Sequence, residues 1–351
     1  MPSAGGRSEA ASRPPGIRRT RLSRGVLRER GPGYALQAAL LVLVAWLAWQ
    51  AAANFIGNVR VLGVSAGFGF LKSEAGFEIA QALIAFGPGS RYGDAVIVAT
   101  LNTLLVVVLA GVFSTLVGVA VAFGRLAAQP LIRALSTTFV EVFRNIPLLL
   151  QIFFWYFSAM ALLPGVGESI GFGGALLNNR GLFLPALQRL PGGWAFVAPH
   201  VDGFDVSGGV TLLPELMALT LGLSIYNGAF LAEIFRAGIL SVPRGQAEAA
   251  ATLGLGGLRA AWFVTLPQAL RLALPPATGQ YQTLAKASSL AAAIGYPDIM
   301  QIVGGTVLSQ TGQALEAMAL VVLLYASINL AIAAAGQLAN RRLLRHEGRS
   351  P

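Results

Sequence analysis

The sequence predicts an all-α, polytopic transmembrane helical bundle. Of its 351 residues, 55% are hydrophobic and only 11% are charged, whereas soluble proteins average about 25% charged residues. A spanning helix needs about 20 predominantly apolar residues. Five stretches without Asp, Glu, Lys or Arg meet or approach that length: 31–59, 95–124, 145–167, 216–232 and 317–340.

The N-terminal tail, residues 1–33, carries eight arginines ahead of the first apolar segment. By the positive-inside rule such a basic segment stays in the cytoplasm, where it can contact anionic lipid. The tail and the apolar core that follows are both longer than those of a secretory signal peptide. We therefore interpret 34–54 as a retained transmembrane anchor, followed by an external loop at 55–92.

Five further spans follow from the alternation of apolar runs with basic loops. An amphipathic stretch at 131–142 is typical of an interfacial helix. The glycine- and proline-rich stretch 164–212 breaks helices and is interpreted as an external insert, which leaves open whether part of it re-enters the membrane. The loop 236–271 and the tail 339–351 are basic and thus cytoplasmic, so both termini are predicted inside. These spans are 95–124, 147–163, 213–235, 272–294 and 315–338.

Composition excludes several kinds of chemistry. There is no cysteine, so disulfides, thiolate metal sites and thiol catalysis are absent. His200 and His346 are the only histidines, and we expect no metal site. A net charge of +10 would suggest nucleic acid for a soluble domain, but here the positive charge marks cytoplasmic segments. Short matches to a serine elbow at 63–67 and a phosphate loop at 71–73 lack their required context, so we expect no catalytic residue.

The most informative motif lies in the cytoplasmic loop 236–271. Small residues there let another surface approach a short helix closely, Gly254 stops or bends that helix, and Pro267 fixes where the next helix begins. From the residues alone, a docking knob for a soluble partner and a solvated amphipathic loop remain equally open. The motif reads Glu248-Ala249-Ala250, three residues, Gly254, nine residues, then Val264-Thr265-Leu266-Pro267.

This spacing resembles the EAA loop of permease subunits of bacterial ABC importers. Other segments are similar to the polar amino acid permease subgroup and occur in its order, at 141–156, 232–239, 241–246 and 286–290. The resemblance covers roughly residues 93–338. A narrower similarity to permeases of general L-amino acid importers is carried by Asn58–Arg60, Gly67–Leu71, Ala75–Ile79 and Tyr92–Gly93.

The resemblance implies a type I ABC importer permease fold over residues 93–338. It implies a transporter subunit, not an enzyme, that moves amino acids into the cytoplasm across the bacterial inner membrane. Its implied partners are two ATPase subunits, a second and related permease, an external amino acid binding protein and membrane lipid. ATP would bind to the partner ATPase, and this chain would hold no cofactor. A helix from Glu248 to Trp262 would couple ATPase motion to the spans, through Glu248, Ala249, Ala250, Gly254, Leu266 and Pro267.

Polar side chains inside spans are costly and are therefore functional candidates. Lys286 has no acidic residue within 11 positions, so it must find an acceptor on another helix, either as a structural tether or as a lining of the transport path. Glu233 and Arg236, three residues apart, are predicted to pair with each other. The substrate-path candidates are Asn102, Gln151, Gln280, Lys286 and Ser289, and interhelical hydrogen bonding is the alternative for each.

The main alternative function is an ion-coupled secondary transporter of a small polar solute. Such proteins contain inverted repeats with broken helices at matched positions. Pro275-Pro276 interrupts the fifth of these six spans, but the first half of the sequence offers no matching break.

Overall fold

The computed structural model describes residues 36–47, 49–50, 53–54, 67–190 and 193–345. The chain divides into two units, Met1–Ser65 and Ala66–Pro351. In the first unit an apolar helix spans Leu36–Leu47, inside the predicted anchor 34–54. The remainder of that anchor lies mostly, and the basic tail wholly, outside the described residues.

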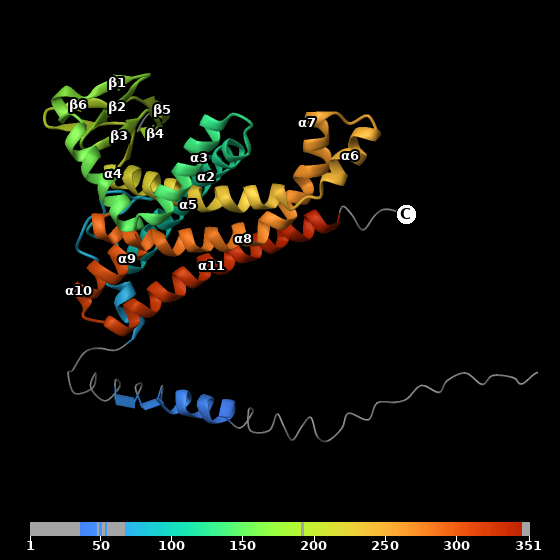
Figure 1. Ribbon diagram of the computed structural model, residues 1–351. Helices are drawn as coiled ribbons and strands as arrows, with labels where there is room; N and C mark the ends of the chain where they lie inside the picture. Colours follow the sequence, from blue (N-terminus) through green and yellow to red (C-terminus); the bar gives the residue numbers. More distant parts are fainter. Residues whose placement is uncertain (1–35, 48, 51–52, 55–66, 191–192, 346–351) are drawn as a thin grey trace, which may run out of the picture. The chain divides into compact units, whose positions relative to one another are not determined.

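The second unit is built mainly from helices that coincide with the predicted spans. Among the described residues, three helices are individually long and apolar enough to cross a membrane. They are α2 (Tyr92–Leu126), α5 (Pro214–Leu240) and α11 (Ala314–Arg345). Helix α5 packs against α2 and against α8 (Leu266–Ala287), and α8 packs against α11. Figure 1 shows α5, α8 and α11 running side by side.

The span predicted at 147–163 is part of a bent pair of helices. Helix α3 covers Pro130–Asn145 and helix α4 covers Leu148–Leu162, and the two axes differ by 103°. Pro147 at the junction has no N–H to continue the helical hydrogen bonds. The predicted interfacial helix 131–142 is present as α3, and α4 alone is shorter than an ordinary span.

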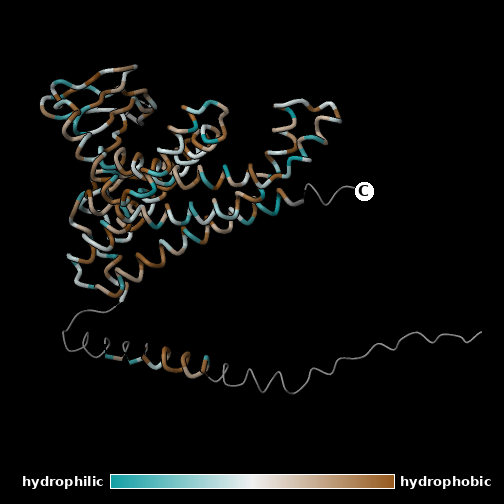
Figure 2. Tube along the Cα trace, viewed as in Figure 1, coloured by the Kyte–Doolittle hydropathy of each residue, from teal (hydrophilic) through white to brown (hydrophobic). Residues whose placement is uncertain are grey.

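The span predicted at 272–294 forms as α8 followed by a 3₁₀ helix at Ser288–Ile294. Pro275 and Pro276 lie inside α8. Figure 2 shows hydrophobic colour along much of α11 but mixed colour along α8. Because polar side chains are costly against lipid, much of α8 must face protein or water.

The external insert is a small β-structure, which sequence analysis did not predict. Four strands form an antiparallel sheet in the order β1-β2-β3-β8, and β4–β5 and β6–β7 form separate hairpins. Figure 1 shows the strands at the opposite end of α5 from α6 and α7. Strands of three to five residues are too short to show a clear alternating pattern. They are β1 to β8 at Ile170–Phe172, Ala175–Asn178, Gly181–Leu184, Ala186–Leu190, Gly193–Val197, His200–Asp202, Asp205–Ser207 and Val210–Leu212.

Two segments outside the predicted spans pack into the core of the second unit. Phe70, on a 3₁₀ helix at Phe68–Lys72, is buried in one cluster with Ile299 and Val303. The backbone N–H of Gly67 donates to Glu316 Oε1 at 2.6 Å, which ties this segment to the start of α11. The second segment contains α9 (Ile299–Gln301), a π-helical stretch (Ile302–Val307) and α10 (Leu308–Thr311).

Helices α2 and α5 approach each other closely at two glycines. A Cβ atom on Gly118 would lie 2.8 Å from the Cβ of Leu231, and one on Gly228 would lie 2.7 Å from Val117 Cγ1. Without aqueous hydrophobic driving force, helices in a membrane associate through such close van der Waals packing. The two glycines therefore set the distance between α2 and α5.

We expect Gly118→Ala to lower the free energy of unfolding by about 1–3 kcal/mol, because the added methyl group overpacks this contact. Thermal unfolding of the purified protein in detergent measures the change. The control is Gly111→Ala on the same helix, where no atom lies within 4 Å of the new Cβ. That control should be neutral or stabilising by up to about 1 kcal/mol, and equal stability of the two variants would contradict the packing argument.

Candidate functional site

The predicted coupling residues lie on a helical hairpin, which we call the coupling hairpin (Arg244–Thr265). It consists of α6 (Arg244–Thr252), α7 (Gly257–Ala260) and a π-helical turn (Ala261–Thr265). Figure 1 shows it projecting beyond the ends of α5 and α8. Glu248 and Ala249 are exposed, whereas Ala250 is buried.

Gly254 ends the first helix of the hairpin. Its φ is +79°, a left-handed conformation that glycine adopts without a Cβ penalty. The N–H groups of Gly254 and Leu255 donate to the carbonyls of Ala251 and Ala250, both at 3.0 Å, as at many helix ends. The expectation of one helix from Glu248 to Trp262 is therefore wrong, because this turn divides it. Pro267 lies in the first turn of α8, as predicted.

The coupling hairpin exposes large apolar side chains. Leu253 and Leu258 are 81% and 77% exposed, on either side of the turn at Gly254. Trp262 and Phe263 are also exposed. Exposed apolar groups gathered in this way mark a surface that another protein or a membrane covers.

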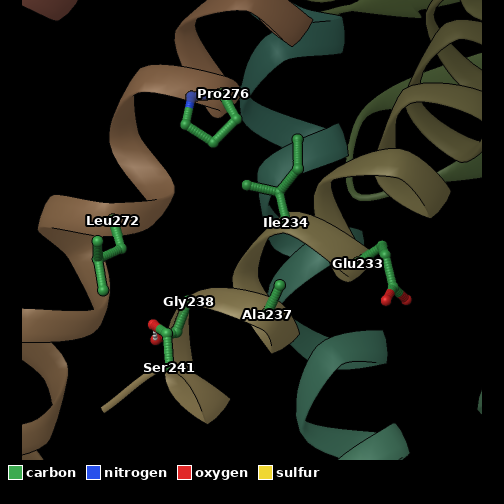
Figure 3. A pocket seen from close by; sticks show the side chains of 7 residues that line it. All are labelled: Glu233, Ile234, Ala237, Gly238, Ser241, Leu272 and Pro276. Carbon is green, nitrogen blue, oxygen red and sulfur yellow. Dashed lines mark hydrogen bonds between the residues drawn. The ribbon is translucent and has the colours of Figure 1, made fainter.

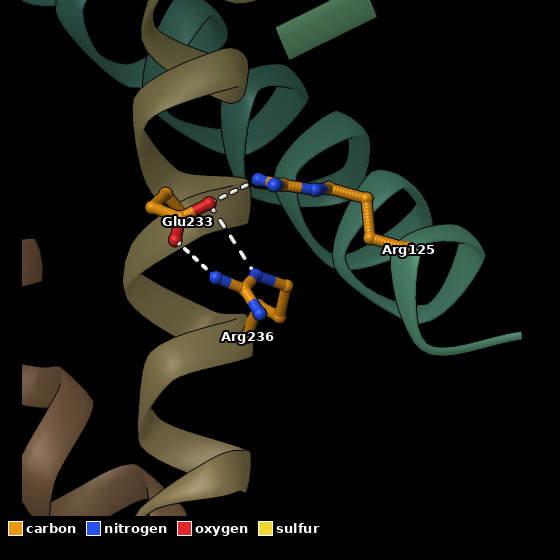
Figure 4. Close-up of polar contacts among 3 residues, drawn as sticks. All are labelled: Arg125, Glu233 and Arg236. Atoms are coloured by element: carbon orange, nitrogen blue, oxygen red, sulfur yellow. Dashed lines mark hydrogen bonds and ion pairs between the residues drawn. The ribbon is translucent and has the colours of Figure 1, made fainter. Parts of the chain in front are cut away.

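The predicted ion pair is present and has a third member. Arg236 Nη2 donates to Glu233 Oε1 at 2.5 Å, and Arg125 of α2 forms an ion pair with Glu233 Oε2. Figure 4 shows the carboxylate of Glu233 between the two guanidinium groups. Sequence reasoning missed Arg125 because it lies 108 residues away. Glu233 thus joins α2 to α5.

A pocket of about 380 Å³ opens between α5 and α8. Figure 3 shows Leu272 and Pro276 of α8 facing Ile234 of α5 across it, with Glu233 at its edge. Its walls are mainly apolar, and among the described residues no group of three or more His, Cys, Asp or Glu could hold a metal ion. Its lining residues are Glu233, Ile234, Ala237, Gly238, Ser241, Leu272 and Pro276.

Two of the substrate-path candidates are held by backbone carbonyls. Asn102 is fully buried, and its Nδ2 donates to the carbonyls of Gln81 (2.7 Å) and Pro297 (2.9 Å). Gln151 is also buried, and its Nε2 donates to the carbonyls of Phe143 and Ile146 at the end of α3. These contacts favour structural roles for both residues, since each amide satisfies carbonyl groups that helix ends or loops leave free.

Gln280 belongs to a chain of side chains that crosses three helices. Its Nε2 donates to Asn227 Oδ1 on α5 at 2.7 Å, and Asn227 Nδ2 donates to Ser114 Oγ on α2 at 3.1 Å. Asn227 was not among the predicted site residues. A single polar residue in an apolar run gives no periodic signal, so only the fold identifies its partners.

Lys286 and Ser289 lie in the C-terminal half of the span predicted at 272–294. Lys286 is exposed and forms no ion pair within the part of the chain that the structure describes. Ser289 Oγ donates to the backbone carbonyl of Lys286 at 2.8 Å. Gly279, Thr283 and Lys286 form an exposed stripe on α8, which we call the α8 stripe.

A buried acidic residue was missed by sequence analysis. Asp298 caps α9: its Oδ1 accepts from the Gln301 N–H and its Oδ2 from the Tyr325 hydroxyl, both at 2.8 Å. Burial raises the pKa of Asp298 to about 6, although these hydrogen bonds act in the opposite direction. An Asp just before a short apolar run is an N-cap signal that could have identified it.

We expect a double-mutant cycle of Arg125→Gln and Glu233→Gln to give a coupling free energy of about 1 kcal/mol or more, above the value for exposed pairs. The physical reason is that the pair joins two helices at partly buried positions. Thermal unfolding of the four proteins in detergent measures it. The exposed pair Arg180–Asp205 is the control, and its coupling free energy should be less than about 0.5 kcal/mol. Equal coupling free energies for the two pairs would contradict a stabilising ion pair between α2 and α5.

The chain is similar in sequence and in fold to several known proteins. Residues 114–345 match the family described as "Binding-protein-dependent transport system inner membrane component". The chain is 40% identical to YhdX of Escherichia coli, named as an amino-acid ABC transporter permease, over 87% of this chain and 91% of YhdX. It is 38% identical to the general L-amino acid transport system permease AapQ of Rhizobium johnstonii, over 84% and 88%. A solved amino acid ABC transporter with histidines has the same fold, with 24% identity, 72% and 95% coverage and a TM-score of 0.52.

Proposed function

We propose a substrate and a set of partners on the premise that this chain belongs to the family of binding-protein-dependent transport system inner membrane components. The chain is a transmembrane permease subunit of an ABC importer in the inner membrane, and ATP hydrolysis takes place on a separate subunit. This confirms the predicted permease function and fold class. Nothing supports the ion-coupled secondary transporter.

The substrates are amino acids, carried into the cytoplasm. The names of the two relatives that align along most of this chain support this proposal. An external binding protein delivers the amino acid on the side of the β-structured insert, which lies at the opposite end of α5 from the coupling hairpin (Figure 1). Both termini lie in the cytoplasm.

The coupling hairpin docks onto an ATPase subunit. The observation that carries this proposal is the turn at Gly254, which presents Leu253 and Leu258 to the outside on a short, rigid element. Ala250 is buried on α6, which packs against the rest of the hairpin, and the hairpin continues directly into α8 at Leu266 and Pro267. Each of two permease subunits would engage one ATPase, which makes two ATPases in the complex.

A second, related permease covers the α8 stripe. The lysine is costly against lipid, and glycine and threonine are enriched where transmembrane helices meet, so the stripe suits a protein interface or an aqueous path. Lys286 would then face the space between the two permeases, where its ammonium group can attract the carboxylate of an amino acid. Gln280 on α8 and Ser289 on the 3₁₀ helix that follows it would line the same path.

We expect Gly254→Lys to leave the protein inserted and folded but to reduce ATPase co-purification and substrate-stimulated ATP hydrolysis by about tenfold or more. A non-glycine residue in the left-handed region costs about 1–2 kcal/mol, and the charged side chain would project into the docking contact. Pull-down and hydrolysis assays with binding protein and amino acid measure the effect.

The matched control is Gly89→Lys, an external glycine with no atom within 4 Å of its Cβ position. It should retain ATPase binding and hydrolysis. Normal uptake by Gly254→Lys, with an unchanged unfolding temperature, would refute docking through this hairpin.

We expect Lys286→Gln to reduce amino acid uptake by about tenfold while ATPase co-purification stays intact. The loss corresponds to one charge-assisted hydrogen bond to substrate, worth about 1.5–3 kcal/mol. Uptake of labelled amino acid into proteoliposomes measures it, with Lys72→Gln in the external segment as control. Unchanged uptake would exclude Lys286 from the path, and a large fall in the unfolding temperature would indicate a structural tether instead.

A further inference from the structure

Three arginines, from α2, α3 and α5, lie along one stretch of α5 between Phe230 and Arg236. Arg125 and Arg236 both pair with Glu233. One turn earlier on α5, the guanidinium carbon of Arg144 lies 4.6 Å above the centroid of the Phe230 ring. We call Arg125, Arg144, Glu233 and Arg236 the arginine cluster.

The arginine cluster carries a net charge of +2, because it contains three guanidinium groups and one carboxylate. Glu141 precedes Arg144 by three residues on α3, but the two form no ion pair in the described structure. Arg144 is exposed, and Arg125 and Arg236 are partly exposed. Each guanidinium group therefore keeps N–H donors that a further anion can use.

The position of the cluster selects the kind of anion. Glu233 lies seven residues before Leu240, the last residue of α5, which is about 10 Å along the helix. Arg125 and Arg144 are next to the last residues of α2 and α3. The cluster therefore lies on the membrane side of the coupling hairpin, at the cytoplasmic end of the spans, where the phosphate groups of the inner leaflet are within reach of snorkelling side chains.

The Phe230 ring holds the guanidinium group of Arg144 by a cation–π contact. This contact leaves the N–H donors of Arg144 available to an anion. Basic pockets between transmembrane helices on the cytoplasmic side are suited to anionic lipid headgroups, because guanidinium binds phosphate in a bidentate manner.

We propose that the arginine cluster binds the phosphate headgroup of an anionic phospholipid of the inner leaflet. This inference goes beyond the proposed transport function, but it rests on the orientation proposed there, with the coupling hairpin on the cytoplasmic side. The lipid phosphate occupies the donors that Glu233 leaves free, and it links α2, α3 and α5 at their cytoplasmic ends.

The full-length chain, purified with its associated subunits and stripped of lipid in mild detergent, tests the proposal. We expect phosphatidylglycerol to raise the unfolding temperature by about 3 °C or more above an equal concentration of phosphatidylcholine. In the Arg144→Gln variant this difference in unfolding temperature should fall to half or less, because the variant lacks one guanidinium group while the ion pairs of Glu233 stay intact. Phe230→Leu, which keeps every charge but removes the stacking surface, should lose a smaller part.

Arg133→Gln is the matched control, since Arg133 is an exposed arginine on the same helix outside the cluster. It should respond to phosphatidylglycerol as the parent protein does. Equal shifts with both lipids, or a full response in Arg144→Gln, would overturn the proposal. A shift reproduced by inorganic phosphate alone would assign the cluster to a soluble phosphate compound. Loss of the ATPase from Arg144→Gln with a full lipid response would assign it to a protein interface.

Discussion

The contact between α2 and α5 is the one on which the other parts of the second unit depend. Gly118 and Gly228 bring the two backbones close together. Ser114 and Asn227 join them by a hydrogen bond between side chains, and Arg125 and Glu233 join them by an ion pair. These contacts differ in kind, but each needs the short distance that the glycines allow. Helix α8 packs against α5, and Gln280 of α8 donates a hydrogen bond to Asn227 of α5.

Polar groups in this bundle are satisfied largely within the protein, as a low-dielectric environment demands. Asn102 and Gln151 serve backbone carbonyls at a loop and at a bend, so two residues that resemble substrate ligands in sequence act as supports for irregular backbone. The α8 stripe is the contrasting case, since Lys286 has no ion-pair partner in the described residues. The amide N–H groups of Asn102 and Gln151 thus have partners inside the protein, whereas the ammonium group of Lys286 is exposed and available to another molecule.

Sequence reasoning predicted the helices well because each long helix has an uninterrupted apolar run, as α2 and α11 do. It also predicted the pair Glu233–Arg236, because a spacing of three places both residues on one helical face. It missed Arg125, Asn227 and the environment of Asp298, because these depend on which helices become neighbours. The insert was missed as β-structure since its strands are too short for an alternating pattern. The coupling hairpin was predicted in position, and Gly254 was predicted to stop or bend its helix. The continuation of one helix to Trp262 was wrong, because the left-handed φ of Gly254 ends it.

Helix α5 joins the β-structured insert to the coupling hairpin. One residue separates its start from the last strand of the insert, and three residues separate its end from the first residue of the coupling hairpin. Apart from its first residue it contains no proline, unlike α8. An unbroken helix transmits a displacement along its axis, so an axial movement of the coupling hairpin would move the β-structured insert in the same direction. Helix α5 therefore links the two regions mechanically.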